Sequence, residues 1–201
     1  MPDYFALLDE PRRPWLDPDS LRQKFLALSS DAHPDKIHDA GEQKRRDAAT
    51  HFAELNAAYQ CLADPKSRLR HLVELEQGAR PADVQQVPPA LADLFAEVAT
   101  ACRNADAFLA ERSRATSPLV RAQLFERAHE WMDTLGSLQK RLGVFHDNLL
   151  DELKSLDAAW TAAGREAHAE PLRRLEELYR RFGYFNRWNS QIKERMVQLT
   201  L

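Results

Sequence analysis

The chain has 201 residues, of which 44% are hydrophobic and 29% charged, a balance typical of a globular protein. Its formal net charge is −3 and its basic residues form no dense run, which argues against electrostatic binding to nucleic acid or to an anionic membrane. The six glycines form neither a GxGxxG nor a GxxxxGK[ST] motif, so no glycine-rich phosphate loop is expected.

The first ten residues, MPDYFALLDE, carry acidic side chains in place of the basic segment that opens a secretory signal. No apolar run approaches the length that spans a membrane. Cys61 and Cys102 are far apart, which indicates a reducing compartment without a disulfide framework or a cysteine-based zinc site. We therefore expect a cytoplasmic protein that has no metal and no cofactor.

Two apolar stripes with helical spacing occupy the first third of the chain. Their members are Leu21, Phe25, Leu28 and Ala32 in the first stripe, and Ala48, Phe52, Leu55, Tyr59 and Leu62 in the second. Pro34 and Gly41 lie between the stripes and break any continuous helix, so the spacing predicts two antiparallel helices joined by a compact loop. Asp64-Pro65 restarts the chain and predicts a further short helix.

Residues 79–90 are rich in proline and have no helical stripe, which predicts a linker between a domain at 1–78 and a domain at 91–201. The second domain shows stripes over 91–109, 124–142, 149–163 and 172–199, the third of them following Gly143. Asn189 replaces an apolar residue in the last stripe. The fold class predicted from these patterns is all-α, with a helical bundle after the linker.

The tripeptide His33-Pro34-Asp35 places two polar side chains on the loop between the first two long helices. Four interpretations are open. The histidine and aspartate suit acid–base chemistry, but no nucleophile or second carboxylate stands at a telling spacing. Together with His38 and Asp39, they provide side chains of the types that bind metal ions, but they form no known metal-binding motif. A recognition loop on a rigid scaffold is the third interpretation and a simple turn the fourth. We expect no enzymatic activity.

Residues 1–78 resemble a J domain, and more specifically the HscB family of J-type co-chaperones in iron–sulfur cluster assembly. The resemblance rests on Asp3-Tyr4-Phe5, the loop from Pro11 to Asp17, the tripeptide followed by Lys36, the stretch Leu55–Leu62, and Pro65, Arg68, Leu72, Leu75 and Gly78. Residues 172–199 resemble the final bundle helix of that family. The resemblance implies an N-terminal J domain, an antiparallel helix hairpin with short helices, followed by a C-terminal client-binding helical bundle.

The resemblance also implies a partner, a DnaK- or HscA-type heat-shock ATPase whose ATP hydrolysis the J domain accelerates. The residues implied to contact this ATPase are His33, Pro34, Asp35, Arg22, Lys24 and Lys36. Basic residues on the second helix of a J domain steer docking, yet acidic residues outnumber basic ones in residues 1–78.

The implied client is an iron–sulfur scaffold protein, and the residues implied to contact it are Leu91, Phe95 and Tyr184, each of which also suits a core position. Residues 91–115 lack the dense glutamate pattern of the family. Two alternatives therefore stay open: a J-domain co-chaperone for a different client, and a helical adaptor that no longer couples to an ATPase.

Overall fold

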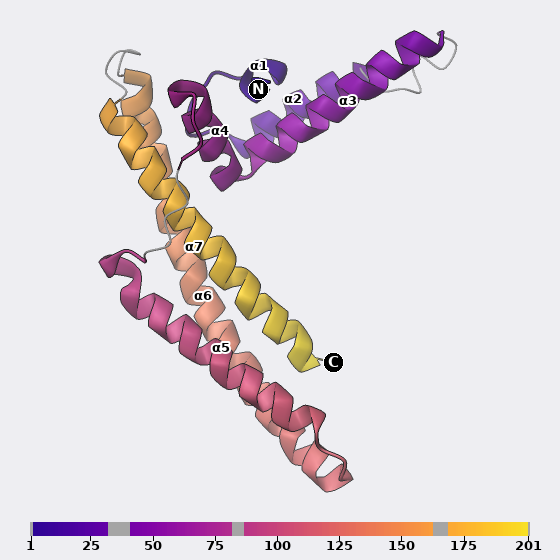
Figure 1. Cartoon of the computed structure of the whole chain (residues 1–201), viewed down its shortest axis with the longest axis vertical. Helices are drawn as coiled ribbons and strands as arrows, with labels where there is room; N and C mark the ends of the chain where they lie inside the picture. The colour runs from indigo at the N-terminus through magenta and orange to yellow at the C-terminus, as the bar shows by residue number, and fades with distance from the viewer. Residues whose placement is uncertain (1, 32–40, 82–86, 163–168, 201) are drawn as a thin grey trace. The chain divides into compact units, whose positions relative to one another are not determined.

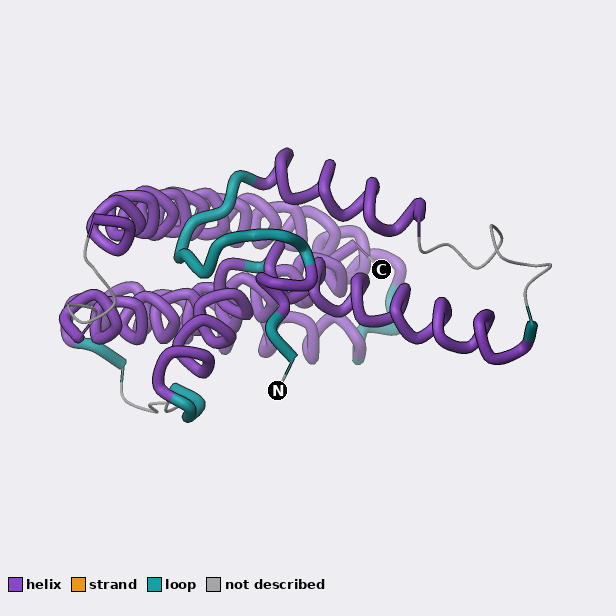
Figure 2. The backbone as a smooth tube through the Cα atoms, turned by 90° about the horizontal axis from the view of Figure 1, so that it is seen from above, coloured by secondary structure: helices purple, strands orange, loops and turns teal. Residues whose placement is uncertain are grey.

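A computed structural model describes residues 2–31, 41–81, 87–162 and 169–200, and every regular element in these ranges is a helix (Figure 2). The all-α fold class is thereby confirmed. The chain divides into two compact units (Figure 1). Unit 1 comprises Met1–Ala82 and Leu150–Arg180, and unit 2 comprises Asp83–Leu149 and Arg181–Leu201.

Unit 1 begins with a single capped turn, α1 (Tyr4–Leu7). The Asp3 carboxylate accepts hydrogen bonds from the backbone N–H groups of Phe5 at 3.0 Å and Ala6 at 3.3 Å, which satisfies donors that a helix start leaves open. Phe5 is fully buried. The next helix, α2 (Pro18–Asp31), follows Asp17, whose carboxylate accepts from the backbone N–H of Ser20 at 2.9 Å.

The helices α2 and α3 (Glu42–Ala63) lie side by side in both views, as the two apolar stripes predicted. The rings of Phe25 and Tyr59 stack between them with centroids 4.3 Å apart. The helix α4 (Pro65–Gln77) begins where Asp64-Pro65 predicted, because the Asp64 carboxylate accepts from the N–H of Ser67 at 2.7 Å. It ends at Gly78, which adopts a left-handed φ of 73°.

The segment Leu150–Arg180 belongs to unit 1 because its side chains hold the loop between α1 and α2. The buried carboxylate of Asp157 accepts hydrogen bonds from Arg13 Nε and from the backbone N–H of Trp15, each at 3.0 Å. Trp160 Nε1 donates to the Arg12 carbonyl at 3.0 Å. The apolar stripes predict this segment as part of a domain at 91–201, whereas the compact units of the structure are not contiguous in sequence.

Unit 2 contains the turn η2 (Pro89–Leu91), the helix α5 (Ala92–Ser113), and parts of α6 (Pro118–Ala162) and α7 (Ala169–Thr200). α6 runs unbroken through Gly143, so the apolar stripes on either side of this glycine belong to one helix. The buried core of unit 2 includes Val98, Cys102, Ala105, Phe108, Leu124, Leu135, Leu138, Leu142, Trp188 and Ile192. No helix in the described ranges is both long and apolar enough to span a membrane.

Candidate functional site

The outward face of α2 presents one cation and one apolar side chain. Arg22 and Leu26 are both exposed, Leu26 to 54%, and they are four residues apart, so they share one side of the helix. Phe25, by contrast, packs against Tyr59 of α3. The exposure of Leu26 is not among the features predicted from the sequence. The available signal was that Leu26 falls outside the i, i+3, i+4 stripe that starts at Leu21.

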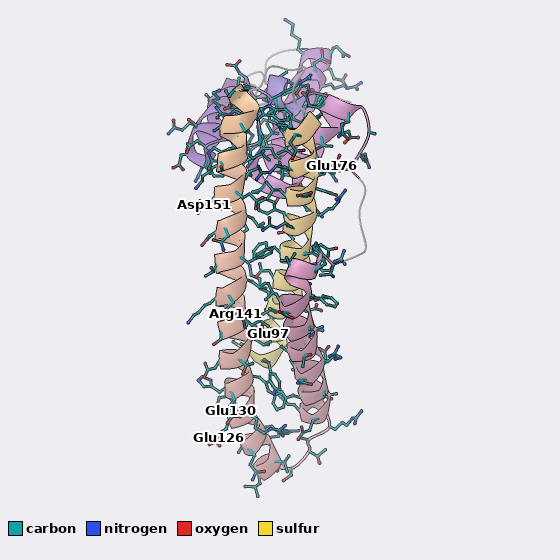
Figure 3. All side chains as sticks on the ribbon, turned by 90° about the vertical axis from the view of Figure 1, so that its left-hand side faces the viewer. Glu97, Glu126, Glu130, Arg141, Asp151 and Glu176 are labelled. Atoms are coloured by element: carbon teal, nitrogen blue, oxygen red, sulfur yellow. The ribbon has the colours of Figure 1, made fainter. Side chains whose placement is uncertain are left out.

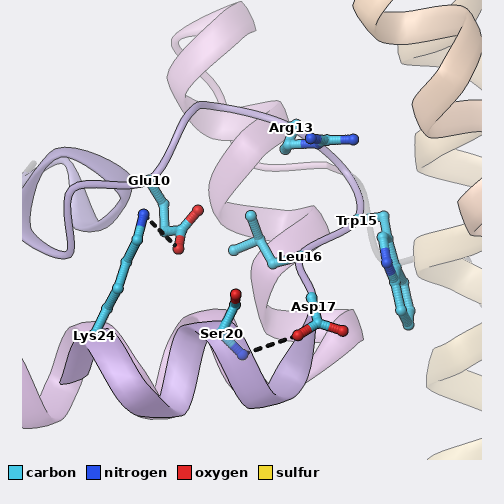
Figure 4. A pocket seen from close by; sticks show the side chains of 7 residues that line it. All are labelled: Glu10, Arg13, Trp15, Leu16, Asp17, Ser20 and Lys24. Atoms are coloured by element: carbon cyan, nitrogen blue, oxygen red, sulfur yellow. Dashed lines mark hydrogen bonds and ion pairs between the residues drawn. The ribbon is translucent and has the colours of Figure 1, made fainter. Parts of the chain in front are cut away.

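Lys24 is tied to the loop that precedes α2. Its ammonium lies 3.0 Å from the Glu10 carboxylate and donates to the Asp9 carbonyl at 2.7 Å (Figure 4). These contacts border a hollow of about 240 Å³ that Arg13 and Trp15 also line. Of the three basic residues expected to face the ATPase, the structure describes Arg22 and Lys24: Arg22 is exposed, whereas Glu10 offsets the charge of Lys24.

His33, Pro34, Asp35 and Lys36 lie outside the described residues, as do the alternative metal ligands at 38 and 39. The structure describes the two helices that flank them: α2 ends at Asp31 and α3 begins at Glu42. In the sequence the tripeptide falls between these two helices, and its role stays a prediction. Within the ranges that are described, no group of three or more His, Cys, Asp or Glu side chains is arranged to hold a metal ion.

Two buried polar side chains of α4 fix the N-terminal segment of unit 1. Arg68 Nε donates to the Pro14 carbonyl at 2.8 Å, and its guanidinium lies 5.9 Å from the centre of the Trp15 ring. Burial lowers the pKa of Arg68 to about 10. His71 Nε2 accepts from the backbone N–H of Tyr4 at 3.1 Å, and burial lowers the pKa of this imidazole. Arg68 and His71 thus stabilise the packing of unit 1.

The three residues expected to contact a client differ in accessibility. Leu91 and Tyr184 are buried in the core of unit 2. Phe95 is 44% exposed, and its ring centroid lies 6.3 Å from that of Trp188. Phe95 is therefore the one of the three that offers a sizeable surface to a partner, and the assignment of all three to client binding stays a prediction.

The carboxylates of α5 are largely engaged within the bundle. Glu97 pairs with Arg141 of α6, and Figure 3 shows the two side chains facing each other between the helices. Asp106 pairs with Arg195 at 2.6 Å, and Glu111 forms a two-point contact with Arg127 at 2.7 and 3.0 Å. These three ion pairs link α5 to its neighbours at the surface of the bundle.

Comparison with known proteins places this geometry in a class. A family model described as the DnaJ domain matches residues 3–71. A curated "Co-chaperone protein HscB homolog" of Paraburkholderia phymatum is 35% identical over 72 residues, which are 36% of this chain and 41% of the relative. A protein of the same name from Vibrio cholerae is 38% identical over 74 residues, 37% of this chain and 43% of the relative. The match thus spans about two fifths of the length of these curated relatives.

Two solved structures share the fold. Chaperone HscB from Vibrio cholerae has a TM-score of 0.59 at 23% identity, covering 98% of this chain and 99% of that one. The human co-chaperone protein HscB has a TM-score of 0.59 at 18% identity, covering 96% and 81%. Residues 3–71 thus match the DnaJ domain, within a fold whose described elements are all helices. More particularly, the chain resembles HscB, through the sequence of its J domain and through a fold shared along nearly its whole length.

Proposed function

We propose that this chain is a cytoplasmic co-chaperone that stimulates ATP hydrolysis by a DnaK- or HscA-type heat-shock ATPase and delivers an iron–sulfur scaffold protein to it. The observation that carries the proposal is the match of residues 3–71 to the DnaJ domain, which includes His33-Pro34-Asp35 between α2 and α3. The chain has no reaction of its own to catalyse. It acts by favouring one of two states of its partner, and the chemistry takes place in the ATPase.

The exposed face of α2 suggests how docking is steered. Arg22 presents an outward charge to an acidic ATPase surface, while Leu26 adds apolar contact area beside it. Lys24 contributes less because its ammonium is already paired with Glu10. Since charges at the rim of an interface act mainly on the association rate, docking should slow as ionic strength rises.

Single-turnover ATP hydrolysis by DnaK and by HscA tests the J-domain function. The wild-type chain should accelerate hydrolysis, and His33→Gln should abolish the acceleration at every concentration. Arg22→Ala should lower the association rate several-fold, whereas Lys24→Ala should lower it less. Arg103→Ala, at an exposed arginine of α5, is the matched control and should change nothing. A wild-type chain that leaves the ATPase rate unaltered would establish the adaptor alternative instead.

The client is the second part of the proposal, and tethering explains why a second domain matters. A client held on the bundle meets the ATPase at the high local concentration that a shared molecule provides. Phe95 is the candidate anchor because its ring is partly exposed at the start of α5. The alternative of a different client is favoured by one observation: Glu97, Asp106 and Glu111 are paired within the bundle.

Calorimetric titration of the full-length chain with a purified iron–sulfur scaffold protein separates the two clients. Binding that weakens about tenfold in Phe95→Ala supports the scaffold protein as client. Val197→Ala, at an exposed apolar residue of α7, is the control for loss of apolar surface and should bind normally. Absence of binding by the wild-type chain, together with normal stimulation of the ATPase, would retain the J-domain function and reject the scaffold protein.

A further inference from the structure

Exposed apolar side chains gather where α5 turns into α6. Leu119 is 71% exposed and Phe125 is 77% exposed. Val120, which lies between them in the sequence, is exposed too. Three of the seven exposed large hydrophobic residues in the described part of the chain thus fall within two helical turns. Exposed apolar groups that cluster in this way mark interaction sites more often than scattered ones do. We call residues 112–125 the turn surface.

The exposure of Phe125 does not result from an unfilled core. Its neighbour Leu124 is buried, as is Ala128 one turn later, and both belong to the core of unit 2 together with Phe108 of α5. The helix therefore already directs one complete apolar stripe inward at this end. Phe125 lies off that stripe, so its large apolar ring is not needed to hold α6 in place.

Two arginines border the exposed ring. Arg112, Arg121 and Phe125 line a hollow of about 260 Å³. Arg112 donates to the Leu199 carbonyl at 2.8 Å, and Arg121 Nε donates to the Ala115 carbonyl at 3.1 Å. These backbone carbonyls orient the two guanidinium groups and leave further N–H donors on each.

The charge of these arginines is not offset by an ion pair among the described residues. The nearest acidic side chain along α5, Glu111, is already held by Arg127 through both carboxylate oxygens. Oriented guanidinium groups beside an apolar ring are suited to a carboxylate next to an apolar side chain, because the fork of N–H donors matches the two carboxylate oxygens.

We infer that the turn surface is a second docking site, and that it takes an acidic, apolar segment of a partner protein. In this assignment a carboxylate of the segment binds Arg112 and Arg121, and a neighbouring Leu, Ile or Phe side chain packs on Phe125. The site lies on unit 2 and is independent of the function proposed for the J domain.

A protein segment fits this surface better than an anionic bilayer does. The site is hollowed, which suits a protruding side chain rather than a flat layer of headgroups. Glu126 and Glu130 lie on α6 close to this end of the bundle (Figure 3), and their negative charges oppose the approach of a broad anionic surface. A short segment contacts the arginines without covering these carboxylates.

An array of short fluorescent peptides tests the inference with the full-length chain. In the first set an Asp or Glu stands beside Leu, Ile or Phe; matched sets replace the acid by its amide, or the apolar residue by Ser. Fluorescence polarisation should find members of the first set that bind at least about tenfold more tightly than either counterpart. Arg121→Glu and Phe125→Ser should each weaken these peptides about tenfold or more.

Val144→Ser is the matched control, because Val144 is an exposed apolar residue of α6 outside the turn surface, and it should bind like the wild type. Circular dichroism should be the same for all variants, since none of the altered side chains is buried. The inference is overturned if no peptide of the first set exceeds its counterparts, or if both turn variants bind like Val144→Ser. Sedimentation with phosphatidylglycerol vesicles that Phe125→Ser abolishes, without peptide binding, would assign the surface to a membrane instead.

Discussion

Replacing Asp157 with Asn tests the anchor that joins the loop between α1 and α2 to α6. The change keeps the shape of the side chain but removes its negative charge and one of the two carboxylate oxygens that accept hydrogen bonds from the Arg13 guanidinium. Breaking an ion pair with both members buried costs roughly 3–5 kcal/mol. The Arg13 side chain is 38% exposed, so water rehydrates its guanidinium and the expected cost falls to about 2 kcal/mol.

For a chain of this size, each kcal/mol shifts the thermal midpoint by about 2–4 °C, so we expect a decrease of about 4–8 °C by differential scanning calorimetry. Asp151→Asn is the matched control: its exposed carboxylate pairs with Lys154 on the surface of the same helix, and its loss should cost less than about 0.5 kcal/mol. Equal midpoints for the two variants would refute the argument that Asp157 anchors the loop.

Three further predictions concern unit 1 and α6. Burial lowers the pKa of His71 below 6.5, so the unfolded chain binds the proton first as pH falls. Stability should therefore be complete above about pH 6.5 and decline below it; His71→Gln should flatten this decline in urea unfolding, and the exposed His129→Gln should not. Gly78→Ala should destabilise by about 1 kcal/mol because of its left-handed φ, whereas Gly136→Ala, within α6 and with open space around it, should stabilise by up to about 1 kcal/mol. Asp64→Ala should lower the free energy of unfolding by about 1 kcal/mol through loss of the α4 cap, which a lower urea midpoint would show. An unchanged midpoint would contradict the capping role.

The sequence predicted those features that depend on local signals. The break between α2 and α3 follows from Pro34 and Gly41, and the start of α4 follows from the capping aspartate and Pro65. Gly143 shows how packing overrides such a signal. Buried leucines on both sides of this glycine hold α6 continuous, and the intrinsic cost of one glycine in a helix is only about 1 kcal/mol.

Pairings between residues far apart in sequence were not predictable. Nothing around Lys24 indicates that Glu10 offsets its charge, because the contact depends on how the intervening loop folds back. The same holds for Arg13 and Asp157, which are 144 residues apart. Phe125 illustrates a different limit: the type of an apolar residue does not reveal whether it lies inside or outside, and only its offset from the stripe through Leu124 indicates exposure.

The pairing of Arg13 with Asp157 has a consequence for biosynthesis. A ribosome that adds about 5–20 residues per second needs roughly 7–29 s to make the chain between them. During that interval the N-terminal segment has been synthesised, but the part of α6 whose Asp157 binds Arg13 and Trp15 has not. Completion of unit 1 therefore awaits translation of α6, and a ribosome stalled before codon 150 would display an unfinished J-domain unit to the cell's own holdases.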